Sequence, residues 1–101
     1  MRRREPLGVS AITLLEIALL FGSGAARSDV HAAELLGDLE SNPAFEIVPF
    51  TLDVAAEVAA LGPSLRDPAD RAIVATARVR RLQLLTSDQR IIDSDLVPVV
   101  A

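Results

Sequence analysis

Several residue types that mark particular classes of protein are absent from this chain of 101 residues. There is no cysteine, which excludes disulfides and thiolate metal sites and fits a reducing cytoplasm. Tryptophan and tyrosine are also absent, which argues against an aromatic surface for stacking nucleic-acid bases. The longest apolar run, Leu14 to Phe21, contains Glu16 and is too short to cross a bilayer. We therefore expect a cytoplasmic protein that does not enter a membrane.

Two common kinds of site are missing as well. There is no glycine-rich phosphate loop, because the residues from Gly22 to Gly24 follow a helical pattern instead of preceding one. His31 is the only histidine, and no serine or threonine pairs with it convincingly as a catalytic triad would require. We interpret His31 as a surface residue of a helix.

The overall charge is acidic and does not favour general nucleic-acid binding. The formal net charge is -4, from 14 acidic and 10 basic residues. Seven of the ten basic residues nevertheless fall into two arginine clusters, which are Arg2, Arg3, Arg4 and Arg71, Arg78, Arg80, Arg81. A local basic patch can hold a phosphate backbone even on an acidic protein. For Arg78, Arg80 and Arg81 we favour the simpler interpretation, in which they stabilise the carbonyl end of a helix dipole.

The hydrophobic pattern predicts one α/β domain over residues 1–101. Half of the residues are hydrophobic, which is enough for a core. Strands are expected at residues 7–9, 45–50, 82–86 and 96–100, and a short helical turn at 88–93. Helices are expected from a cap at Ser10 or Thr13 to about Phe21, and at residues 29–39, 51–61 and 70–80. This alternation implies a mostly parallel sheet with right-handed crossovers.

Acidic residues stand at the ends of two predicted elements. Asp67 and Asp70 precede an apolar helix, and Asp88 follows Thr86 just after an apolar strand. A parallel sheet brings such positions to one edge, outside the carboxyl ends of its strands. Each residue also has an ordinary structural explanation. One of the first two can be the helix cap, with Pro68 at the first helical position, and Asp88 can be a turn aspartate.

Glu16 is the third carboxylate of interest. Its near neighbours on the predicted helix are all apolar, and a lone buried carboxylate is costly, so it must be solvated, paired or coordinating. The alternative is an exposed flank of an amphipathic helix. Together Glu16, Asp70 and Asp88 would suit Mg²⁺ or Mn²⁺, which can activate water for attack on a phosphodiester.

Three blocks of the sequence resemble the PIN domain, and most closely the VapC-type toxins of bacterial type II toxin–antitoxin systems. The blocks are Val9 to Ile17, Asp67 to Ala77 and Leu85 to Asp88, within a resemblance that extends from Pro6 to Val100. The resemblance implies a three-layer α/β/α fold and a metal-dependent endoribonuclease that cleaves RNA with Mg²⁺ or Mn²⁺. It also implies a homodimer and a cognate antitoxin that holds the enzyme inactive.

The resemblance assigns roles to individual residues. Glu16, Asp70 and Asp88 match catalytic, metal-binding carboxylates of the family, Thr86 matches a small hydroxyl residue that supports the site, and Asp67 is a cap or an outer group. One departure concerns the family's first strand, which is central in its sheet and carries the first catalytic aspartate. We expect this strand and its helix to be missing here, which would leave the strands at residues 7–9 and 82–86 without a shared neighbour.

Three functional hypotheses follow. The leading one is a VapC-type endoribonuclease, although the absent first aspartate counts against activity. The alternative is an inactive PIN remnant that uses its apolar helices at residues 12–21 and 29–39 for dimerisation or antitoxin binding. The third is a small α/β binding domain whose acidic residues are placed by chance, and we rank it last because the three blocks would have to coincide by accident.

Overall fold

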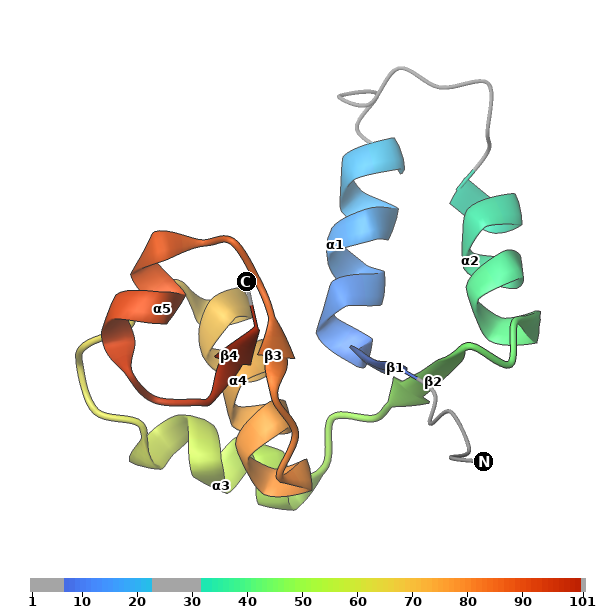
Figure 1. The fold of residues 1–101 in the computed structure, drawn as a ribbon. Coiled ribbons are helices and arrows are strands. Elements are labelled where there is room, and N and C mark those ends of the chain that lie inside the picture. The colour runs from blue at the N-terminus through green and yellow to red at the C-terminus, as the bar shows by residue number, and fades with distance from the viewer. Residues whose placement is uncertain (1–6, 23–31, 101) are drawn as a thin grey trace, which may run out of the picture. The chain divides into compact units, whose positions relative to one another are not determined.

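The computed structural model describes residues 7–22 and 32–100, and the chain divides into two compact units, residues 1–49 and 50–101 (Figure 1). The first unit contains β1 (Leu7–Ser10), α1 (Ala11–Gly22), α2 (Ala32–Ser41) and β2 (Phe45–Val48). The second contains α3 (Leu52–Ala60), α4 (Pro68–Arg80), β3 (Leu84–Leu85), α5 (Gln89–Ser94) and β4 (Val99–Val100). His31, the first arginine cluster and the start predicted for the second helix lie outside the described residues. A single domain over residues 1–101 stays a prediction.

The first unit is a parallel strand pair whose connection carries two helices. β1 pairs with β2 in the register Leu7 to Phe45 through Ser10 to Val48. Ser10 is buried at the end of β1, and its hydroxyl accepts the backbone N–H of Ile12 at 3.1 Å. This bond satisfies a donor that the first helical turn leaves free, so Ser10 and not Thr13 is the cap of α1.

The second unit is held together by α3 and α4. The Thr51 hydroxyl caps α3 by accepting the N–H of Val54, and Asp67 caps α4. Between the two helices the chain turns at Gly62, whose φ of +79° is a conformation that glycine adopts without strain. The buried cluster contains apolar residues from both helices, from α5 and from the connecting segments, namely Val54, Leu61, Leu65, Val74, Ala75, Ala77, Ile91 and Val97.

The second strand pair is shorter than the sequence predicts. β3 and β4 are parallel, but each has two residues, with Leu84 opposite Val99 and Leu85 opposite Val100. Pro98 has no N–H and contributes only its carbonyl, which accepts the N–H of Leu84 at 2.8 Å. The predicted strands at residues 82–86 and 96–100 are therefore correct in place and direction, and too long.

The predicted α/β class with parallel strands is confirmed, but the described strands do not form one sheet. They form two sheets of two strands, β1 with β2 and β3 with β4. Among the described residues neither β1 nor β3 has a second partner strand. The three-layer arrangement, and the absence of the family's first strand, stay predictions. Within residues 7–22 and 32–100, none of the helices has the length and apolar character needed to cross a membrane.

Candidate functional site

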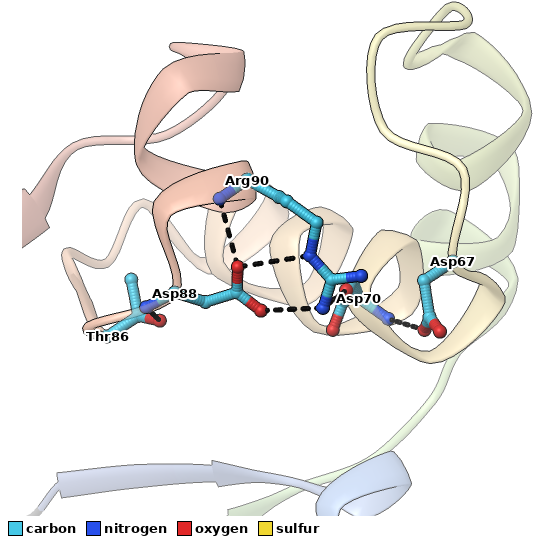
Figure 2. A network of polar contacts seen from close by, with 5 residues as sticks. All are labelled: Asp67, Asp70, Thr86, Asp88 and Arg90. Carbon is cyan, nitrogen blue, oxygen red and sulfur yellow. Dashed lines mark hydrogen bonds and ion pairs between the residues drawn. The ribbon is translucent and has the colours of Figure 1, made fainter.

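The acidic residues of the second unit come together where α4 and α5 begin. Asp67 and Asp70 stand at the start of α4, and Asp88 directly precedes α5, three residues after the end of β3 (Figure 2). The hydroxyl of Thr86 lies in the turn between β3 and Asp88. The structure thus brings together four of the five residues that the sequence singles out.

Asp67 is the structural member of the α4 pair. Its Oδ1 accepts the backbone N–H of Asp70 at 2.9 Å, and Pro68 occupies the first helical position. This is the bond by which an aspartate caps a helix, so the cap is assigned to Asp67 and not to Asp70. The side chain of Asp70 is thereby left without a role in starting the helix.

Asp70 carries a buried oxygen that lacks a hydrogen-bond partner. Its side chain is 16% exposed, and its Oδ2 makes no hydrogen bond. It forms an ion pair with the Arg90 guanidinium, whose Nη2 lies 3.8 Å from this oxygen. Burial raises the pKa of Asp70, and the charges of Asp67 and Asp88 raise it further. A buried acceptor left unpaired is rare in native proteins, because it has lost water without gaining a partner.

Asp88 is held from two sides. Its backbone N–H donates to the Thr86 hydroxyl at 3.0 Å, which fixes the turn after β3. Its Oδ1 accepts the backbone N–H of Arg90 at 2.9 Å and so caps α5. The Arg90 guanidinium contacts both carboxylate oxygens, with Nε 3.3 Å from Oδ1 and Nη2 3.0 Å from Oδ2. These hydrogen bonds from Arg90 hold the pKa of Asp88 below its usual range.

Arg90 is the site residue that the sequence reasoning missed. Its guanidinium lies between Asp88 and Asp70 (Figure 2). A signal was present, because Arg90 falls in the first turn of α5, where the helix dipole disfavours a positive charge. An arginine at such a position, two residues after an aspartate, indicates a side chain held by a carboxylate.

A cavity of about 270 Å³ adjoins this cluster. Six residues of the second unit line it, namely Ser64, Leu65, Arg66, Asp67, Asp70 and Arg90. Asp70 and Arg90 therefore face a space that a small ligand and water could enter.

Arg71 fixes the wall of this cavity and does not belong to a phosphate-binding patch. Its Nη1 donates to the carbonyls of Gly62 and Leu65, both at 2.6 Å, and its Nη2 donates to the carbonyl of Val58 at 2.7 Å. These bonds attach the segment after α3 to the start of α4. Arg78 is likewise paired within the unit, since its Nε lies 3.0 Å from Glu57 Oε1. A phosphate-binding role for the second arginine cluster thus loses these two members.

Glu16 is exposed on α1, in the first unit. An exposed position agrees with the alternative of a solvated helix flank, and the meeting of Glu16 with the second-unit carboxylates stays a prediction. No group of three or more His, Cys, Asp or Glu side chains within residues 7–22 and 32–100 could hold a metal ion. What the second unit itself provides is a pair, Asp70 and Asp88.

This pair has the chemistry that a hard divalent cation requires. Mg²⁺ is commonly held by one or two carboxylates together with substrate phosphates and several waters, so Asp70, which lines the cavity, and Asp88 match the protein's part of such a site. The Oδ2 of Asp70 accepts no hydrogen bond and is an available ligand atom, and Asp88 supplies a second carboxylate close to the same guanidinium. The donor atoms are all oxygen, which favours Mg²⁺ or Mn²⁺ over softer metals.

Comparison with known proteins places this arrangement in a family. No curated protein matches the chain. The family model described as the PIN domain matches residues 1–95, which includes all five residues singled out from the sequence. This match spans nearly the whole chain, and it agrees with the α/β fold and with the acidic pair of the second unit. The chain therefore belongs to the PIN domain family, a family of nucleases.

Proposed function

We propose that the chain is a metal-dependent endoribonuclease of the VapC type, with Glu16, Asp70 and Asp88 as its catalytic, metal-binding carboxylates. The observation that carries this proposal is the buried Oδ2 of Asp70, which accepts no hydrogen bond and lies beside Asp88. An acidic oxygen kept out of water without a hydrogen bond is costly to the fold, and a cation that it can bind repays that cost.

The residues of the second unit divide the work between them. Asp70 and Asp88 would hold Mg²⁺ or Mn²⁺, Thr86 orients Asp88 through its backbone N–H, and Asp67 fixes the start of α4. The bound cation would supply a water of lowered pKa and positive charge for the phosphodiester. Glu16 would add a third carboxylate from α1.

The proposed setting is a cytoplasmic toxin–antitoxin pair, in which the chain acts on RNA, forms a homodimer and is held inactive by a cognate antitoxin. Supporting this, α1 presents large apolar side chains to solvent. Leu15 is 53% exposed and Leu19 is 62% exposed. Exposed leucines one helical turn apart form an apolar stripe of the kind that protein partners cover.

An inactive PIN remnant that serves as a dimerisation or antitoxin-binding module is the second candidate. The observation that favours it is the exposed apolar stripe of α1, which includes Leu15 and Leu19 and which a binding module needs whether or not it cuts RNA. Such a module would keep the apolar stripe of α1 and lack nuclease activity.

A cleavage assay separates the two candidates. The chain, and a version extended by residues encoded in frame upstream, are incubated with RNA and Mn²⁺, with EDTA as the metal-free control. We expect Mn²⁺-dependent cleavage that is lost in Glu16→Gln, Asp70→Asn and Asp88→Asn. The matched control is Asp93→Asn, which removes the same charge from α5 at an exposed position whose contact is with Gln89. Wild-type cleavage by all three site variants would refute the assignment. No cleavage by either version, together with dimerisation, would favour the remnant.

A further inference from the structure

We propose that Arg90 is an internal counter-ion that competes with the divalent cation for Asp70 and Asp88. This inference rests on the proposed function of those two carboxylates as metal ligands. In the absence of metal, the guanidinium would offset one of the two negative charges. To admit the cation, the guanidinium would have to leave Asp88.

The contacts of Arg90 place its charge where the cation is needed. Nη2 of Arg90 lies 3.0 Å from Asp88 Oδ2 and 3.8 Å from Asp70 Oδ2. The same nitrogen therefore lies near one oxygen of each of the two carboxylates that would hold the cation. Nε contacts the remaining oxygen of Asp88 at 3.3 Å, so the arginine holds Asp88 through both of its oxygens (Figure 2). A guanidinium in this position and a divalent cation on the same oxygens would repel each other.

The positive charge of Arg90 can be removed from the two carboxylates only if its side chain moves away. A guanidinium stays protonated throughout the working pH range, so it cannot give up its charge to the incoming cation. Its side chain is 73% exposed, so it can swing into solvent with little loss of packing. Water reaches the arginine side of the ion pair and weakens it, which lets a divalent cation displace the guanidinium.

Helix stability does not account for this arginine. The bond that caps α5 joins the Asp88 carboxylate to the backbone N–H of residue 90, and any residue except proline would supply that donor. A positive charge in the first turn opposes the helix dipole. The contacts of the Arg90 side chain with Asp88 and Asp70 are thus not needed to start the helix, and their effect is on the charge of the two carboxylates.

Mn²⁺ binding by the full chain tests the competition without reference to cleavage. Isothermal titration compares the wild type with Arg90→Gln and with Arg66→Gln. Arg66 is the matched control, because it lines the same cavity but forms no ion pair or hydrogen bond with Asp70 or Asp88. Removing a unit charge that lies close to the bound ion should lower the Kd of Arg90→Gln by roughly tenfold. Arg66→Gln should stay within about twofold of the wild type, because its charge is more distant and screened by solvent. Far-UV circular dichroism checks that the variants keep their helices.

Each outcome bears on the proposal. Tighter binding by Arg90→Gln alone supports it, as does binding by Arg90→Gln when the wild type shows none. Equal or weaker binding by Arg90→Gln, with a wild type that binds, overturns the competition and leaves the proposed nuclease function standing. An equal gain in Arg66→Gln also overturns it, because general charge would then explain the effect. No binding by any of the three proteins would remove the metal site and, with it, both proposals.

Discussion

Replacing Asp70 by asparagine should make the metal-free protein more stable while it removes a proposed metal ligand. The Oδ2 of Asp70 is buried without a hydrogen bond, and the negative charges of Asp67 and Asp88 repel its charge. A charged carboxylate that is kept from water beside two like charges is costlier to bury than a neutral amide, and the attraction to Arg90 offsets part of this cost. Asparagine keeps the shape of the side chain and its need for a hydrogen-bond partner, so the gain comes only from removing the charge. We expect the free energy of unfolding to rise by about 1 kcal/mol at neutral pH.

The pH dependence of this gain has a definite sign. Burial and the neighbouring carboxylates raise the pKa of Asp70 in the folded state above its ordinary value of 3.8. Between the two values the folded chain binds more protons at this group than the unfolded chain, so the contribution of Asp70 to stability falls as the pH rises. The gain from Asp70→Asn should therefore be full above the raised pKa. It should shrink as the pH is lowered toward 3.8.

Urea denaturation followed by circular dichroism, with EDTA present, measures this gain at a series of pH values from 7 to 4. The control is Asp93→Asn, whose side chain is exposed, and its effect should stay within about 0.5 kcal/mol of the wild type. A loss of stability in Asp70→Asn at neutral pH, or a gain no larger than that of the control, would refute the reasoning. In that case the buried oxygen would carry no cost, and the main argument for a cation at this position would fail.

Three further predictions concern the framework of the site. Arg71→Met should lower the free energy of unfolding by about 2–4 kcal/mol in urea denaturation, since it removes three charge-assisted hydrogen bonds to carbonyls. A change below about 1 kcal/mol would contradict this role. Thr86→Val should weaken Mn²⁺ binding by roughly threefold in isothermal titration, because the backbone N–H of Asp88 loses its acceptor; an unchanged Kd would argue against Thr86 as a support of the site. Gly62→Ala should cost about 1 kcal/mol by the same denaturation assay, since the φ of +79° is strained for alanine although its methyl group would meet open space, and a neutral result would contradict the strain.

Local chemistry made much of the second unit predictable. The spacing of Asp67, Pro68 and Asp70 predicts a helix start, and the structure has it there. The sequence left open which aspartate is the cap, because both lie within one turn of the start. Only the backbone geometry separates them, by giving the N–H of Asp70 to the carboxylate of Asp67.

Features that depend on distant parts of the chain were harder to predict. The sequence alone does not connect Arg90 with Asp70, because their contact exists only after the starts of α4 and α5 have come together. The strands of the second unit were predicted too long, since an apolar run does not show where the partner strand stops pairing. The role of Glu16 stays a prediction for the same reason, because it depends on how α1 meets the second unit.

The identity of the cap of α4 has a consequence for the electrostatics of the cavity. Serine or threonine would accept the N–H of Asp70 as well as Asp67 does, so the helix itself does not require a charge at this position. The charge of Asp67 acts on Asp70 and helps to raise its pKa. Because the cap is an aspartate, the same residue determines where the helix begins and adds negative charge that attracts cations to the cavity. Asp67→Ser would separate these two effects, because it keeps the first and removes the second.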